Sequence, residues 1–263
     1  MTIHYARRLT ASHRTRQANW HLGIALAFVA GAINAGGFLA VQRYTSHMTG
    51  VVSAMADNLV LGSYGMVLAG ACALLFFLSG AAFTAILVNY ARRRGLYSEY
   101  ALPLLIEALL LLGFGLLGAR LSTIEGLFVP ATVMLLCFIM GLQNALITKI
   151  SKAEIRTTHL TGTITDIGVE LGKLVYWNMH ERPDRPRVLA DRGRLKLLTL
   201  LVLAFFVGGV SGAFGFKHAG YLSTVPLALI LTGLAVVPML DDLGAVLRRL
   251  RKRGAHANTN PEP

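Results

Sequence analysis

Two short motifs in the chain combine a histidine with a hydroxyl group and a glycine. The first is Ser46–Gly50 (Ser-His-Met-Thr-Gly), and the second is Thr158–Gly162 (Thr-His-Leu-Thr-Gly). A Thr-Gly pair here predicts the start of a short helix, where unpaired N–H groups and the positive end of the helix dipole attract an anion. A histidine at such a start can donate a hydrogen bond or carry a proton. The candidate substrate-binding residues are therefore His47, Thr49, Gly50, His159, Thr161 and Gly162.

A structural role is the alternative for both motifs. Thr49 and Thr161 would then cap their helices, and each histidine would bond a neighbouring carbonyl group. The repetition does not decide between the two, because a repeated fold also repeats its helix caps.

An asparagine precedes each motif, within Gly31–Ala35 (Gly-Ala-Ile-Asn-Ala) and Gly141–Ala145 (Gly-Leu-Gln-Asn-Ala). Asn34 and Asn144 are further substrate-binding candidates. They could orient the histidine motifs, although holding two membrane helices together is the interpretation we favour.

Three acidic residues are candidates for ion or proton coupling: Asp57, Glu107 and Asp166. Glu107 lies inside an apolar block, where a charge is expensive and usually faces the bundle interior. It predicts a proton relay or cation coupling, with a protonated carboxyl bonded to a neighbouring helix as the alternative. Asp57 shares a face of small residues that could pack on a helix or line a watery path.

Asp166, Glu170 and Lys173 fall on one face of the second short helix. We expect Glu170 and Lys173 to lie on a solvated surface.

Long apolar blocks, uncharged except for Glu107 in the third, must position these residues. The 263-residue chain is 54% hydrophobic and only 14% charged, whereas soluble domains carry about 25% charged residues. A helix needs about 20 apolar residues to cross a bilayer. The predicted spans are Trp20–Ala40, Tyr64–Val88, Leu102–Gly118, Leu127–Thr148, Leu197–Phe216 and Gly220–Leu240.

The order and spacing of the motifs predict an internal duplication. The asparagine elements are 110 residues apart and the histidine motifs 112. Each half holds one span, a motif segment and two further spans, so the second half enters the membrane from the opposite side. This predicts an all-α membrane protein with two inverted three-helix repeats, as in many secondary transporters. The predicted parts are an N-terminal tail (1–19), a membrane domain (20–240, with repeats 20–118 and 127–240) and a C-terminal tail (241–263).

The basic residues predict the orientation. With a cytoplasmic N-terminus, 22 of the 25 Lys and Arg residues fall in cytoplasmic segments, as the positive-inside rule requires. This explains the net charge of +12 without a nucleic-acid partner, and none is expected.

The motif segments are too short to cross. Asp57 follows nine uncharged residues after His47, and Asp166 lies five residues after Thr161. Each segment is expected to be a half-helix or re-entrant, with an interfacial helix as the alternative.

Known catalytic signatures are missing. The chain has no Walker loop, Gly-x-Ser-x-Gly elbow or His-Glu-x-x-His pair. Cys72 and Cys137 lie in apolar blocks and are expected to be core residues. No catalytic residue, metal site or cofactor is expected, and the chain is not expected to be an enzyme.

Together, Ser46–Gly50, Gly141–Ala145 and Thr157–Gly162 resemble the YoaK-like family of bacterial inner-membrane proteins, a domain of unknown function, over about Gly23 to Leu240. The resemblance implies a multi-pass protein of the bacterial inner membrane and supplies no substrate. One departure is Val51, where that family often has asparagine.

These observations favour a secondary transporter or facilitator of a small solute. The specific hypothesis is that the solute is an anion and that its transport is coupled to protons. The alternative is a non-transporting scaffold, sensory or assembly protein. The expected partners are the lipid bilayer and an unidentified solute, and a homo-oligomer stays open.

Overall fold

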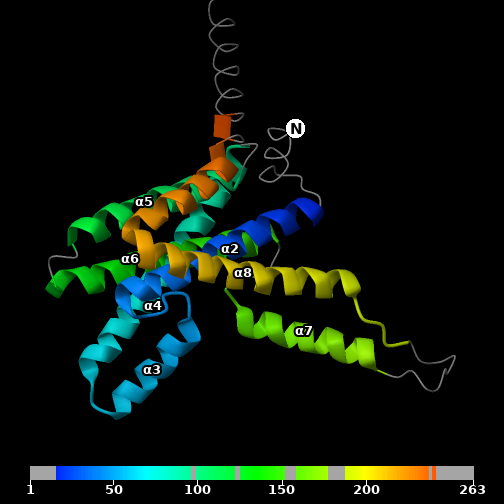
Figure 1. Cartoon of the computed structure of the whole chain (residues 1–263), viewed down its shortest axis with the longest axis horizontal. Coiled ribbons are helices and arrows are strands. Elements are labelled where there is room, and N and C mark those ends of the chain that lie inside the picture. Colours follow the sequence, from blue (N-terminus) through cyan, green and yellow to red (C-terminus); the bar gives the residue numbers. More distant parts are fainter. Residues whose placement is uncertain are drawn as a thin grey trace, which may run out of the picture.

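The computed structural model describes residues 16–95, 99–121, 125–151, 158–176, 187–236 and 239–240 (Figure 1). The predicted tails lie almost wholly outside these residues. The labelled elements are α2 (Arg16–Val41), α3 (Met48–Val60), α4 (Tyr64–Arg93), α5 (Ala101–Leu121), α6 (Glu125–Ile150), α7 (Leu160–Val175), α8 (Arg192–Ala219) and the 3₁₀ helix η1 (Gly220–Ser223). Residues 224–236 are also helical.

Each apolar block forms a helix close to the predicted bounds. Within the described ranges, five helical stretches are long and apolar enough to cross a membrane. This confirms an all-α, multi-pass membrane protein. The fifth stretch, Arg192–Val236, has 45 residues, far more than the 20 or so that span a bilayer. It turns at Gly220, whose φ of 56° suits glycine. The segment after this turn comes back alongside α5 (Figure 1).

The longest helices pair across the two halves of the sequence. α2 packs on α8, and α6 packs on α4. Glycine allows the backbones to come close in both pairs. A methyl group on Gly31 of α2 would overlap the carbonyl oxygen of Phe205 in α8. A methyl group on Gly141 of α6 would overlap the carbonyl oxygen of Phe77 in α4 in the same way.

A second contact of the same kind lies in each pair. Gly208 of α8 faces the carbonyl oxygen of Phe28, and Gly80 of α4 faces that of Phe138. In α2, Phe28 and Gly31 lie 110 residues before Phe138 and Gly141 of α6. In α4, Phe77 and Gly80 lie 128 residues before Phe205 and Gly208 of α8. The two helix pairs therefore use matching sites.

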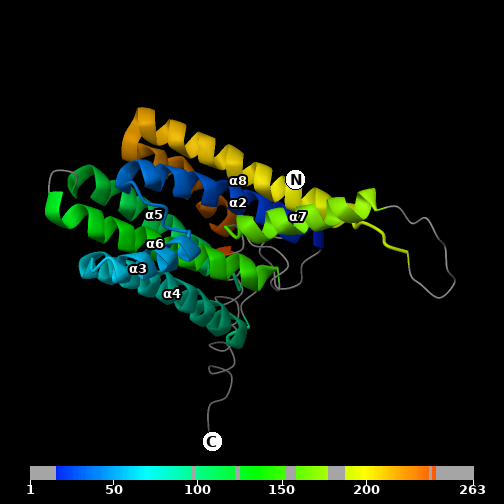
Figure 2. The same ribbon diagram turned by 90° about the horizontal axis from the view of Figure 1, so that it is seen from below.

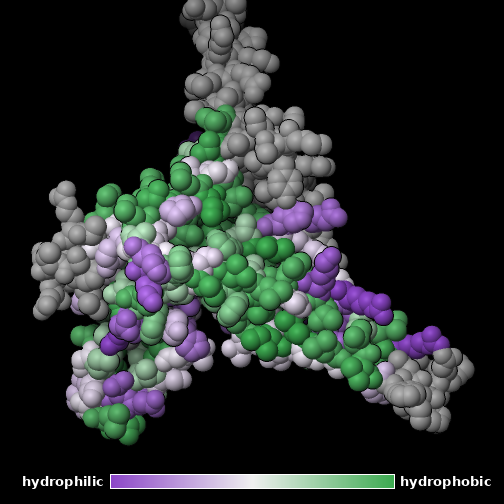
Figure 3. Space-filling model, viewed as in Figure 1, coloured by the Kyte–Doolittle hydropathy of each residue, from purple (hydrophilic) through white to green (hydrophobic). Residues whose placement is uncertain are grey.

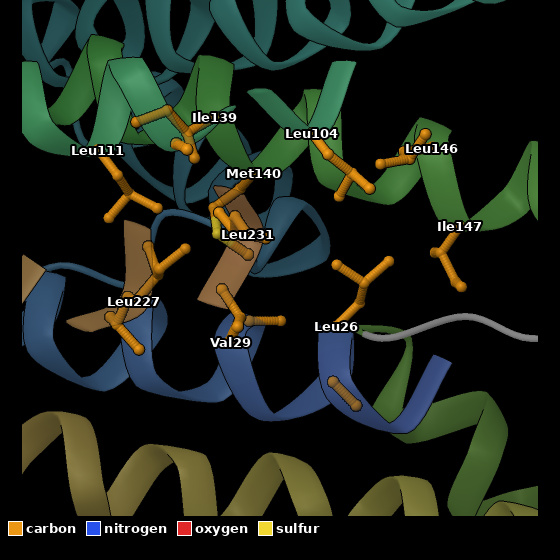
Figure 4. Packing of buried hydrophobic residues seen from close by; sticks show 14 of the residues in the cluster. Leu26, Val29, Leu104, Leu111, Ile139, Met140, Leu146, Ile147, Leu227 and Leu231 are labelled. Carbon is orange, nitrogen blue, oxygen red and sulfur yellow. The ribbon is translucent and has the colours of Figure 1, made fainter. Parts of the chain in front are cut away.

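The core lies where α2, α5, α6 and residues 224–236 meet. Figure 4 shows Leu26 and Val29 of α2 facing Leu104 and Met140, with Leu231 between the helices. Large apolar side chains also cover the outside of α4 and α8, as expected for surfaces that face lipid. Figure 3 shows them on the face that carries α7 and α8, and Phe206 of α8 is 66% exposed.

The motif segments form α3 and α7, of 13 and 16 residues. Both are shorter than a membrane crossing requires, as predicted. α3 packs on α4 and α7 on α8. Figure 2 shows α3 and α7 toward opposite ends of the bundle.

Candidate functional site

Each motif is tied to the asparagine that precedes it. Ser46 Oγ donates a 2.8 Å hydrogen bond to Asn34 Oδ1 of α2. In the second half, Thr158 Oγ1 donates to Asn144 Oδ1 of α6. The side chain immediately before each histidine is thereby fixed to the preceding long helix. The favoured prediction, that these asparagines join two membrane helices, is not supported by these bonds. The bonds join each asparagine to its own motif, and the role of orienting the motifs stays a prediction.

The histidines, and not the threonines, occupy the N-cap positions of α3 and α7. The structural alternative, in which Thr49 and Thr161 cap these helices, is therefore wrong, since each helix begins one residue before its threonine. Both imidazole rings are exposed. Neither histidine side chain makes a capping bond, and neither hydrogen bonds another described residue. The rings are available to a ligand instead.

A cavity of about 560 Å³ lies beside the first motif, between α3, α4, α6 and the chain that joins α2 to α3. α3 contributes one helical stripe to its wall. The members of this stripe are His47, Gly50, Val51, Ala54, Met55 and Asn58. Of the sequence candidates, His47 and Gly50 line this cavity. Thr49 and Asp57 are exposed on other sides of α3.

The turn after α2 brings polar side chains to the cavity. Gln42 adopts a φ of 55°, and its N–H bonds the Phe38 carbonyl at 2.7 Å. This left-handed residue ends α2 and redirects the chain. Tyr44 then stacks on Phe38, with ring centroids 4.5 Å apart. Gln42, Arg43 and Tyr44 all line the cavity.

Arg43, Tyr44 and Asn58 were not predicted from the sequence as site residues. Arg43 carried a signal, because it is the one basic residue in the first predicted outside loop and lies four residues before His47. The positions of Tyr44 and Asn58 depend on the Gln42 turn and on the rotation of α3, which spacing alone does not give.

The second motif has different surroundings. Gly162 has open space where a side chain would project, whereas the His47 ring lies against Gly50. His159, Thr161 and Gly162 are absent from the wall of the 560 Å³ cavity. The structure therefore does not bring the two motifs into one site.

Acidic residues of α7 hold this helix to the start of α8. Glu170 is 2% exposed and accepts bonds from the Asp191 N–H and Lys173 Nζ, both at 2.9 Å. The expected solvated position of Glu170 is therefore wrong. The bond from Lys173, followed by that from the Asp191 backbone, lowers the pKa of Glu170. Asp166 pairs with Arg194 at 2.9 Å, with both side chains 47% exposed.

Glu107 lies in the interior of the bundle, as predicted. It is 0% exposed, and both carboxyl oxygens are buried without a hydrogen-bond partner among the described residues. The alternative of a carboxyl bonded to a neighbouring helix is not seen there. Gln143 of α6 is also fully buried, and its Nε2 donates to the Leu26 carbonyl oxygen at 3.3 Å.

No group of three or more His, Cys, Asp or Glu side chains that could hold a metal ion occurs in the described ranges. The thiol of Cys137 is buried in the cavity wall, and Cys72 is partly buried.

Residues 22–237 match the family model described as "Protein of unknown function (DUF1275)", and the chain belongs to this family. No curated protein and no solved structure matches the chain. The more specific YoaK-like resemblance stays a prediction.

Proposed function

We propose that this DUF1275 protein is a secondary transporter or facilitator of a small anionic solute, built from two inverted repeats in the bacterial inner membrane. The observation that carries the proposal is the matching internal geometry of the two halves. Asn34–Ser46 and Asn144–Thr158 are equivalent hydrogen bonds. The glycine contacts between α2 and α8 recur between α6 and α4 at constant sequence offsets.

Inverted repeats require an odd number of crossings in each half. In our proposal α2, α4 and α5 cross in the first half. α6, α8 and the helix at residues 224–236 cross in the second. The turn at Gly220 supports two crossings within the 45-residue stretch. Both termini are then cytoplasmic, and most basic residues lie on that side.

In this topology α3 lies toward the outside and α7 toward the cytoplasm. The cavity next to His47 is the outer solute site, and His159 with Thr161 and Gly162 marks the corresponding cytoplasmic entrance. Two equivalent entrances on opposite sides are what alternating access between repeats requires. Asn34 and Asn144 orient the two entrances.

Glu107 is the preferred proton-coupling residue, because it is the buried carboxyl at the centre of the described bundle. A carboxyl without a protein partner in an apolar core has a high cost when charged. It can exchange a proton only when a conformational change brings water to it. Asp57 and Asp166 are exposed or ion-paired and are secondary candidates.

The test is uptake of a panel of small anions into proteoliposomes under an imposed proton gradient. Wild type should accumulate at least one solute. His47→Ala should reduce uptake of that solute at least about tenfold, the scale of a lost hydrogen bond to a charged group. Glu107→Gln should bind the solute but fail to accumulate it against a gradient.

His218→Ala is the matched control, because His218 is exposed and bonds the Phe214 carbonyl away from the cavity. Unchanged uptake in both site variants would refute the assigned roles, and an absence of uptake across the panel would favour the scaffold alternative.

A further inference from the structure

The wall of the cavity beside His47 combines two basic side chains with many apolar ones. Among the residues that the structure describes, Arg43 and His47 are the basic members of this wall, and no Asp or Glu lines it. The Arg43 guanidinium donates to the Met66 sulfur at 3.7 Å, which is a weak acceptor. No carboxylate of the described residues pairs with Arg43. A guanidinium without an anionic partner, at the edge of a concave site, is suited to bind an anion.

The remaining wall is apolar and adaptable. Met55, Met66 and Met134 line it, together with Val133 and the Cys137 thiol. Methionine is flexible and polarizable, and it adapts to ligands of irregular shape. Phe38 and Tyr44, which also line the cavity, stack on each other. Binding of an apolar group against such a wall is favourable, because it removes apolar surface from water. Binding of a fully hydrated ion removes little apolar surface and is favoured much less.

The size of the cavity also favours an organic ligand over a simple inorganic ion. Its volume of about 560 Å³ falls in the range of about 300 to 1,000 Å³ for pockets that enclose organic ligands. A water molecule occupies about 30 Å³, so a simple inorganic anion would leave most of the cavity to water.

We infer that the His47 cavity binds an amphipathic organic anion, with the anionic group at Arg43 and an apolar body against the methionines. This inference deepens the proposed transport function by naming the class of solute. Tyr44 and Asn58 supply further hydrogen-bonding groups at the wall. They would select among anionic groups by their geometry.

The test measures binding without transport, in the full-length protein with Cys72 and Cys137 replaced by alanine. Ala54→Cys places a reporter thiol in the cavity wall. Ser53→Cys is the matched control, one residue away on α3, exposed and outside the cavity wall. Both are labelled with anionic sulfonatoethyl and cationic trimethylammonioethyl methanethiosulfonates, with 2-naphthalenesulfonate or sulfate as competitor.

The thiol at position 54 should react faster with the anionic reagent than with the cationic one, relative to the thiol at position 53. Naphthalenesulfonate should slow its labelling, and the same concentration of sulfate should not. Arg43→Gln should weaken this protection roughly tenfold, the scale of a charge-assisted hydrogen bond. Arg43→Lys, which keeps the charge, should retain most of it and shows that loss in Arg43→Gln is not a folding defect.

Equal labelling by the two reagents at position 54, or protection by sulfate as strong as that by naphthalenesulfonate, would overturn the inference. Protection that survives in Arg43→Gln would overturn the role of Arg43. Uptake of the sulfonate into proteoliposomes is measured separately. Protection without uptake supports the binding site and contradicts transport of this class. Uptake of another solute without protection contradicts the inference alone.

Discussion

Asn34 and Asn144 accept hydrogen bonds from the hydroxyl groups of Ser46 and Thr158, the residues directly before the motif histidines. Each motif thus begins at a residue held by a long core helix, which leaves the following histidine exposed at the helix start. A ligand-binding imidazole needs such a rigid support, because a loosely held side chain loses more entropy on binding.

The pair Asn34 and Ser46 should show energetic coupling. In a double-mutant cycle with Asn34→Ala and Ser46→Ala, we expect a coupling free energy of about 1 kcal/mol, the usual net value of a hydrogen bond. Equilibrium unfolding in detergent micelles measures it. Asn144→Ala with Thr158→Ala should give a similar value. If the single changes were additive in both halves, the asparagines would not orient the motifs through these bonds.

At the scale of residues, the sequence indicated which side chains to consider but not which groups they contact. It selected His47, Asn34 and Glu107, and it placed Glu107 correctly inside the bundle. It could not predict that Glu170 reaches the start of α8, because that bond joins positions 21 residues apart across a chain reversal. The role of Arg43 likewise depends on the turn at Gln42.

At the scale of elements, the apolar blocks determine the helices and their approximate ends. The length of an apolar block predicts a membrane-spanning helix directly, because backbone groups in lipid must be hydrogen bonded within the helix. The sequence did not reveal which helices pair. The glycines that permit close approach are ordinary residues of apolar blocks until a partner is known.

Gly31 and Gly113 provide a matched test of helix packing. Gly31→Ala should destabilise the fold by about 1–3 kcal/mol, the usual cost of overpacking, because its methyl group would overlap the backbone of α8. Gly141→Ala should behave alike. Gly113 lies in α5 with open space around it, so Gly113→Ala should be neutral or slightly stabilising. Equal unfolding midpoints for Gly31→Ala and Gly113→Ala would contradict the close α2–α8 contact.

The attachment of α7 to α8 should depend on pH. The pKa of Glu170 is lowered from its ordinary value of 4.5 in the folded protein. Its charged form therefore stabilises the fold above about pH 4.5, and this contribution is lost as the pH falls through the lowered value. Wild type should be more stable than Glu170→Gln at neutral pH, and the difference should vanish in acid.

Thermal unfolding from about pH 7 to pH 3 measures this difference. Asp166→Asn is the control, since its exposed pair with Arg194 contributes at most about 1 kcal/mol. A difference between wild type and Glu170→Gln that grows on acidification would contradict the assigned role of Glu170.

For the whole molecule, the two halves of the chain are interleaved. The first long helix of each half packs on the second long helix of the other, through equivalent glycine contacts. The offsets of the motifs predict a duplication, which is part of our proposal. The exchange of partners could not be predicted, because the sequence carries no information on pairing between segments that are all apolar.

The two motifs also differ more than the repeat predicted. The His47 ring covers Gly50, whereas Gly162 is open. A transporter in one conformational state would show such a difference, with the entrance on one side formed and the other not. In our proposal the cavity beside His47 makes this structure the outward-facing state.

The central claim, inverted repeats with one motif on each side of the membrane, is tested most directly by the sidedness of labelling. Thr49 and Thr161 are equivalent, exposed and outside the Asn–hydroxyl bonds. Thr49→Cys and Thr161→Cys, each in a protein without Cys72 and Cys137, are exposed to a membrane-impermeant maleimide in intact cells and in inverted vesicles. We predict that Thr49→Cys is labelled only in cells and Thr161→Cys only in inverted vesicles. Labelling of both from the same side would contradict the inverted repeat and the two-sided transport site built on it.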